Sequence, residues 1–88
     1  MAKRINRKFH GFSRTPIYGI WAQMKRRCTN KNHVAYDFYG GRGIKMCDAW
    51  FNSFMSFYKD MGDRPSSDYS IDRIDCNGDY TKENCRWV

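Results

Sequence analysis

Three features are missing from this 88-residue sequence, and each absence excludes a class of protein. No apolar run approaches the roughly 18 residues of a membrane-spanning helix, which excludes an integral membrane protein. The basic first residues are followed by no apolar stretch, so we expect no secretory signal and a cytoplasmic location. The length leaves room for one domain with a thin core, which excludes an enzyme built from two domains.

Aliphatic side chains are also sparse, and aromatic side chains take their place. Aromatic residues make up 17% of the chain, although the mean hydropathy is only −0.85. An aromatic content this high is not typical of a disordered chain. The composition therefore predicts a folded domain with a small core built largely from aromatic rings.

Acidic residues are absent from residues 1–27, which carry eight of the 16 basic residues. The other eight basic residues share residues 28–88 with all nine acidic ones, so the net charge of +7 is concentrated at the beginning of the chain. Nucleic acid is the expected partner of such a segment, because cations that neutralise phosphates release condensed counterions. A solubilising tail is the alternative. The predicted nucleic-acid-binding residues are Lys3, Arg4, Arg7, Lys8, Arg14, Lys25, Arg26, Arg27 and, in a glycine-rich loop, Arg42.

The pattern of apolar and capping residues predicts an α+β fold with two amphipathic helices. Residues 1–14 are expected to form a basic arm, and residues 15–88 a single domain. A threonine followed by proline and a stripe of apolar residues predict a helix over 16–28. A second stripe, between an aspartate and a glycine, predicts a helix over 49–61.

The remaining elements are expected to be turns and short strands. Strands over 69–75 and 85–88 are predicted to pair as a small antiparallel hairpin, joined by a turn at 76–79 that contains Asn-Gly. The glycines at 40–41 predict a tight turn with positive φ. A further short strand is expected over 44–47. The two helices should pack on the hairpin.

The candidate catalytic residues lie in one segment near the end of the sequence, residues 70–88, SIDRIDCNGDYTKENCRWV. It places an acid, Asp72, and a strong base, Arg73, on one predicted strand, followed by a polar turn. A carboxylate near phosphate oxygens can hold Mg²⁺, so this pattern beside a basic flank indicates metal-assisted phosphodiester hydrolysis. A plain hairpin with a surface Asp-Arg pair is the simpler alternative, which the residues on their own favour.

The chain resembles the HNH, or ββα-metal, endonucleases, and in particular a group of small phage and mobile-element members. The resemblance covers nearly the whole sequence and implies an HNH-like hairpin in a protein of a phage-infected bacterial cell. The motifs that carry it are His10-Gly11, Thr15-Pro16, MKRRC at 24–28, YGGRGIKMC at 39–47, DMGDRP at 60–65 and IDRID…GDY…NCRW over 71–87.

The resemblance implies a catalytic role for four residues. Asp72 matches the acid that binds Mg²⁺ or Mn²⁺, and Asn84 matches the asparagine that orients the general base. Arg73 stands where the family's histidine base stands, but a guanidinium accepts no proton at neutral pH. Tyr80 is therefore expected as a substitute base or as a phosphate contact. The family's final helix donates a second metal ligand, and the sequence stops before it, so we expect Asp72 to bind metal weakly.

The resemblance leaves two main hypotheses for function. The first is an HNH-like nucleic-acid-binding protein whose enzymatic form cleaves DNA with a divalent metal. The second is a non-catalytic derivative that acts as a small phage inhibitor by binding a host nucleoprotein complex or DNA. A basic subunit of a larger ribonucleoprotein is a third class, which the sequence does not exclude.

The four cysteines contain no CxxC pair, which does not support a zinc ribbon. Without a secretory signal, we expect a reducing compartment and no disulfides. Cys28, Cys47 and Cys85, together with His10 or Cys76, form a candidate tetrahedral zinc site. The alternative is that they are free thiols packed in the core.

Overall fold

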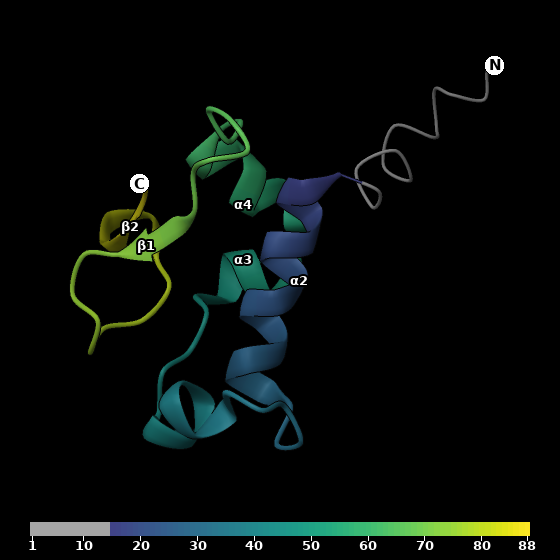
Figure 1. The fold of residues 1–88 in the computed structure, drawn as a ribbon. Helices are drawn as coiled ribbons and strands as arrows, with labels where there is room; N and C mark the ends of the chain where they lie inside the picture. Colours follow the sequence, from purple (N-terminus) through teal and green to yellow (C-terminus); the bar gives the residue numbers. More distant parts are fainter. Residues whose placement is uncertain (1–14) are drawn as a thin grey trace, which may run out of the picture.

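Helix α2 (Pro16–Thr29) runs along one side of the molecule and contributes one wall of the core (Figure 1). The computed structural model describes residues 15–88. The side chain of Thr15 caps the helix by accepting a hydrogen bond from the backbone N–H of Tyr18 at 3.3 Å. The helix buries a stripe that includes Trp21 and Met24. The helix predicted at this position is confirmed.

The second predicted helix is two helices, α3 (Asp48–Asn52) and α4 (Phe54–Met61). The prediction of one continuous helix over 49–61 was wrong because Ser53 leaves the helical conformation, with φ −154° and ψ 117°. Its hydroxyl accepts a hydrogen bond from a backbone N–H three residues on, at 3.2 Å, and so caps α4. A serine competes for backbone hydrogen bonds inside a helix, which explains the break.

Two 3₁₀ helices, η1 (Tyr36–Phe38) and η2 (Gly40–Arg42), follow α2. The predicted tight turn is present, but the positive φ, 88°, lies at Gly43 rather than at the two preceding glycines. Gly40 is required for a different reason. A Cβ at this position would lie 2.2 Å from the carbonyl oxygen of Cys28, so only glycine allows this close approach to α2.

The C-terminal part forms the predicted antiparallel hairpin from strands β1 (Ile71–Arg73) and β2 (Cys85–Trp87), which follows the 3₁₀ helix η3 (Lys82–Asn84). Ile71 pairs with Trp87 and Arg73 with Cys85. Both strands are shorter than expected, although backbone hydrogen bonds continue at both ends, between Ser70 and Val88 and from the N–H of Ile74 to the carbonyl of Asn84.

The strand expected over 44–47 is reduced to one parallel bridge between Met46 and Tyr80. The backbone N–H of Tyr80 donates to the carbonyl of Lys45 at 2.9 Å, and that of Cys47 donates to the carbonyl of Tyr80 at 3.0 Å. These bonds fix the hairpin loop against the segment that precedes α3.

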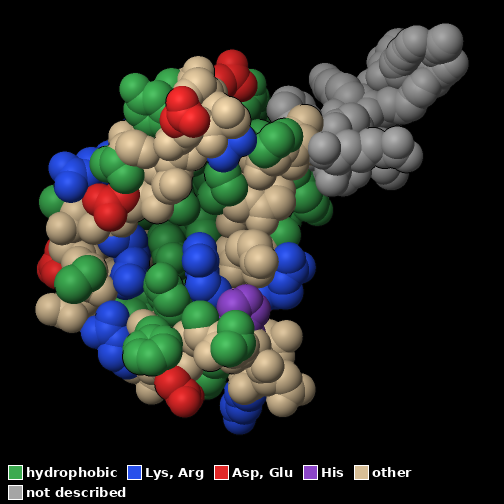
Figure 2. Space-filling model, viewed as in Figure 1, with side chains coloured by type: hydrophobic (Ala, Val, Ile, Leu, Met, Phe, Trp, Pro, Cys, Tyr) green, Lys and Arg blue, Asp and Glu red, His purple; other side chains and the backbone are tan. Residues whose placement is uncertain are grey.

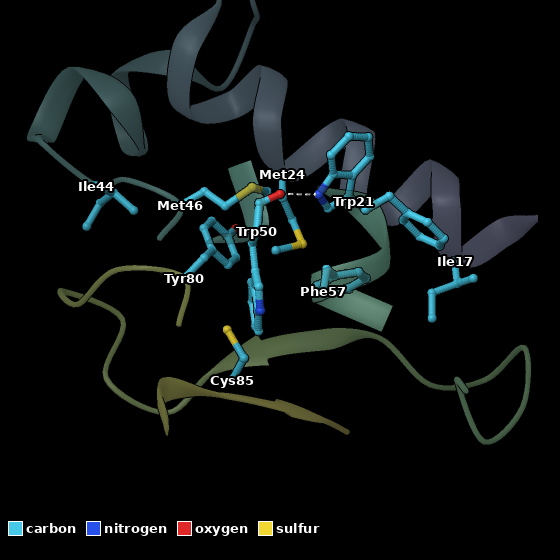
Figure 3. Packing of buried hydrophobic residues seen from close by; sticks show 10 residues of the cluster. Ile17, Trp21, Met24, Ile44, Met46, Trp50, Phe57, Tyr80 and Cys85 are labelled. Atoms are coloured by element: carbon cyan, nitrogen blue, oxygen red, sulfur yellow. Dashed lines mark hydrogen bonds between the residues drawn. The ribbon is translucent and has the colours of Figure 1, made fainter. Parts of the chain in front are cut away.

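The core lies between the helices and the hairpin and is largely aromatic, as predicted (Figure 3). Trp50 of α3 is fully buried at its centre, and its backbone carbonyl accepts a hydrogen bond from Nε1 of Trp21 at 2.8 Å. Phe57 of α4 meets Trp50 edge to face at 5.0 Å. The buried residues are Ile17, Trp21, Met24, Ile44, Met46, Trp50, Phe54, Phe57, Tyr80 and Cys85.

No helix within residues 15–88 is both long and apolar enough to cross a bilayer.

Candidate nucleic-acid interface

A pocket of about 140 Å³ opens where the last turn of α2, the junction of η1 and η2, and strand β1 meet. It brings together three of the four predicted catalytic residues with one predicted nucleic-acid-binding residue, and we call it the arginine pocket. Its lining residues are Arg27, Tyr39, Ile71, Asp72, Arg73, Cys76 and Tyr80.

Two guanidinium groups lie over one tyrosine ring at this pocket. The central carbons of Arg27 and Arg73 are each 5.0 Å from the ring centroid of Tyr39. Arg73 also lies 5.1 Å from the ring centroid of Tyr80, and the two tyrosine rings are stacked at 6.2 Å. Arg73 donates a further hydrogen bond to the carbonyl of Gly78 at 2.9 Å. Ring faces attract cations, so both guanidinium groups are held in place before any ligand binds.

The Nε atom of Arg27 is buried and has no hydrogen-bond partner among the described residues. A buried donor without a partner costs roughly 1–3 kcal/mol. A strong charge-assisted bond from the terminal nitrogens of the same guanidinium to an anion would offset this cost. Arg27 thus combines a stacking contact with Tyr39 and an unsatisfied buried donor.

Asp72 lines the same pocket but is already paired. Its Oδ2 lies 3.0 Å from Nε of Arg86 on the neighbouring strand. The Asp72 side chain is 39% exposed and that of Arg86 is 57% exposed. Exposed pairs of this kind contribute roughly 0–1 kcal/mol, so the Asp72 carboxylate can exchange this partner for another at little cost.

Tyr80 is almost entirely buried, with 3% of its surface exposed. Burial raises the pKa of its phenol to about 12, against the opposing effect of the positive charge on Arg27. The phenol is therefore protonated at neutral pH and is no general base there. It keeps a hydroxyl donor, which suits the other predicted role, contact with a phosphate oxygen.

The side chain of Asn84 forms hydrogen bonds to the backbone of the loop that connects the two strands. Its Oδ1 accepts from the backbone N–H of Asp75 at 2.9 Å, and its Nδ2 donates to the carbonyls of Asp75 at 3.1 Å and of Asp79 at 2.9 Å. A Cβ on Gly78 would lie 2.8 Å from Nδ2 of Asn84, so a side chain there would push this amide away from its hydrogen bonds. Asn84 thus shapes the loop that presents the Gly78 carbonyl to Arg73.

The described residues contain no group of three histidine, cysteine or acidic side chains placed to hold a metal ion. Asp72 is the one carboxylate that lines the arginine pocket within residues 15–88, and the guanidinium groups of Arg27 and Arg73 repel a cation there. These residues do not by themselves fit a site for Mg²⁺ or Mn²⁺, which prefers several oxygen ligands. The divalent-metal site stays a prediction.

The candidate zinc ligands are likewise not assembled as a group within the described chain. Cys85 belongs to the core, where burial raises the pKa of its thiol to about 11, and burial also raises the pKa of Cys28. Cys47 is partly buried against the core, and His10 lies outside the described residues. Zinc stays a prediction.

Two of the other predicted cations, Lys25 and Arg42, have structural contacts of their own. The Nζ atom of Lys25 lies 4.9 Å from the ring centroid of Trp21 and 4.5 Å from that of Phe51. Arg42 donates one hydrogen bond to the backbone of η1 and two to the turn at 76–77. Arg26 is exposed on α2. Outside the described residues lie Lys3, Arg4, Arg7, Lys8 and Arg14 of the expected basic arm.

Two lining residues of the pocket, Tyr39 and Ile71, were not among the predicted site residues. Tyr39 supplies the ring that both arginines share, and its position before the glycine pair was the signal for it. Cys76 also lines the pocket, although the sequence suggested it only as an alternative zinc ligand.

Comparisons of this chain with protein-family models, with curated proteins and with solved structures find no match. What residues 15–88 define is a small α+β domain with an arginine pocket at the edge of a two-stranded hairpin.

Proposed function

We propose that this protein is an HNH-like nucleic-acid-binding protein that holds a backbone phosphate, of DNA in the first place, in the arginine pocket. The observation that carries the proposal is the pair of guanidinium groups, from Arg27 and Arg73, over the single ring of Tyr39. The two arginines come from elements far apart in the chain and meet at one small opening.

The chemistry of the pocket supports an oxyanion as its ligand. Arginine is charged at every accessible pH and presents a planar set of N–H donors that matches a phosphate group. The stacking on Tyr39 and the bond to the Gly78 carbonyl restrict the guanidinium groups in the free protein. Less side-chain entropy is then lost when the phosphate binds.

A second candidate function is metal-dependent cleavage of DNA. It is favoured by the Asp72 carboxylate, which lines the same pocket as the two arginines and is exposed enough to change partners. The non-catalytic alternative is favoured by the two other predicted catalytic groups at the pocket. Neither the guanidinium of Arg73 nor the protonated phenol of Tyr80 accepts a proton at neutral pH.

The binding proposal is tested by fluorescence anisotropy with a labelled DNA duplex over a range of salt concentrations. We expect Arg27→Gln and Arg73→Gln each to weaken binding about tenfold and to reduce the salt slope by about 0.9, the value for one lost phosphate contact. Lys59→Gln is the matched control, because it removes the same charge from an exposed position on α4. If both arginine variants bind as tightly as this control, the pocket is not the phosphate site.

The catalytic candidate is tested by incubating supercoiled plasmid with the protein and Mg²⁺ or Mn²⁺. Nicking by the wild type that is lost in Asp72→Asn supports cleavage. Absence of nicking by the wild type removes the enzymatic form and leaves binding intact. If the wild type binds no DNA or RNA but retains one host protein in stoichiometric amount, the inhibitor hypothesis replaces the proposal.

A further inference from the structure

A larger groove adjoins the arginine pocket. It has a volume of about 540 Å³ and lies between α2 and the segment 64–71 that leads into β1. Arg27 and Ile71 line both hollows, so the groove and the pocket share a wall. Together they form a path from the first turn of α2 to the loop after β1.

The charge of this groove is of one sign. Three arginines line it, Arg26 and Arg27 from α2 and Arg64 from the opposite wall, and none of its described lining residues is acidic. Arg64 is held in position because its Nη1 donates to the carbonyl of Tyr69 at 3.2 Å. Figure 2 shows Lys and Arg side chains on both sides of the hollowed middle of this face. The groove thus continues the positive charge of the pocket.

An aromatic ring lies in the same groove. Tyr69 is 39% exposed and is one of its lining residues. A cationic groove with an accessible aromatic ring is the combination with which proteins hold single-stranded nucleic acids, since phosphates follow the charge and bases stack on the ring. A hollow of this volume is of the size that holds one drug-sized ligand, so it has room for a nucleotide of a single strand.

We propose that this groove binds a single strand of nucleic acid that continues from the phosphate in the arginine pocket. Arg26 and Arg64 neutralise further phosphates, and Tyr69 stacks on a base. This inference rests on the proposed function and adds to it the form of the nucleic acid and three contact residues, of which Arg64 and Tyr69 were not predicted from the sequence.

The charge part of the inference is tested with the double variant Arg26→Gln/Arg64→Gln and a labelled oligothymidine of about 4 to 16 nucleotides, the range that comparable single-strand sites cover. We expect the salt slope to fall by about 0.7 for each lost contact. Lys31→Gln/Lys59→Gln is the matched control, because both lysines are exposed and line neither hollow. Arg26→Gln alone, at an exposed helical position, keeps the test valid if the Arg64 change disturbs folding.

The stacking part is tested at Tyr69. We expect Tyr69→Ala to weaken binding of the oligothymidine roughly five- to a hundredfold, the effect of losing one stacked base, and Tyr69→Phe to retain it. An unchanged affinity in Tyr69→Ala overturns the stacking contact, and a duplex bound at least as tightly as the single strand overturns the assignment to one strand.

The two levels of the proposal fail in different ways. If Arg73→Gln weakens binding while Arg26→Gln/Arg64→Gln behaves like the lysine control, the groove is not the strand path but the arginine pocket still holds a phosphate. If the wild type binds neither single strands nor duplexes, the proposed function itself is wrong.

Discussion

Replacing Asn84 by alanine tests the role that the structure gives to this side chain. Asn84 makes three hydrogen bonds to the backbone of the hairpin loop, two with Asp75 and one with the carbonyl of Asp79. Alanine removes all three bonds and adds no new polar group. We therefore expect Asn84→Ala to lower the free energy of unfolding and to loosen the loop that faces Arg73.

The magnitude follows from these three bonds. One intramolecular hydrogen bond contributes roughly 0.5–1.5 kcal/mol net, and a backbone group that becomes exposed regains a bond to water. The two bonds to Asp75 are exposed and belong at the lower end of that range, while the bond to Asp79 is partly buried. The expected loss is about 2 kcal/mol. In a domain of this size it lowers Tm by about 10 °C.

Urea denaturation followed by tryptophan fluorescence measures the loss. Asn77→Ala is the matched control in the same loop, because its side chain accepts one exposed hydrogen bond, from Arg42, and we expect it to cost less than about 1 kcal/mol. Asn84→Asp keeps the acceptor but turns a carboxylate oxygen towards the carbonyls of Asp75 and Asp79, so it should lose stability as well. If the free energy of unfolding of Asn84→Ala lies within about 0.5 kcal/mol of the wild-type value, the three hydrogen bonds of Asn84 do not stabilise the fold.

Two further predictions concern glycine and pH. Gly19 on α2 has open space around it, so Gly19→Ala should raise the free energy of unfolding by about 1 kcal/mol. Gly40→Ala, in contrast, places a Cβ 2.2 Å from a backbone oxygen and should lower the free energy of unfolding by about 3 kcal/mol or more. Urea midpoints of the two variants that move in the same direction would contradict this contrast. Burial raises the pKa of Cys85 from 9.0 to about 11 and that of Tyr80 from 10.0 to about 12. The folded state thus holds these protons more tightly than the unfolded state, so stability is fully present below pH 9.0 and falls as the pH rises towards about 12. Urea unfolding across this pH range should show the free energy of unfolding decreasing. Cys85→Ala should reduce the part of the decrease that begins near pH 9.0, where the thiol titrates in the unfolded chain. A free energy of unfolding that does not change with pH in the wild type would refute the role given to these two groups.

Helix α2 could be predicted from the sequence because its signals are local. A cap at Thr15 and an apolar repeat fix both its beginning and its buried face. The same repeat over 49–61 hid the break at Ser53, since apolar spacing alone does not show that a serine will cap a second helix. The bridge between Met46 and Tyr80 was missed as well, because a single pair of residues distant in sequence leaves no periodic signal.

The sequence predicted the part of the candidate site that comes from the short segment 70–88. Asp72 and Arg73 are neighbours in the sequence, and they do line one pocket. The sequence could not show that Arg27 and Tyr39 line the same pocket, because their meeting depends on how η1 packs beside the end of α2. The expected grouping of cysteines had the same weakness, as nothing local specifies which of them meet.

Arg42 connects two surface segments that are far apart in the sequence. It bonds to η1 and, across 34 and 35 residues of chain, to Cys76 and Asn77. Neither segment can move away while the other keeps these bonds, so the two should open as one cooperative unit. In native-state hydrogen exchange, the amides of Gly43 and Gly78, which donate to Gly40 and to Asp75 within these two segments, should then share one opening free energy, and Arg42→Ala should separate their exchange rates.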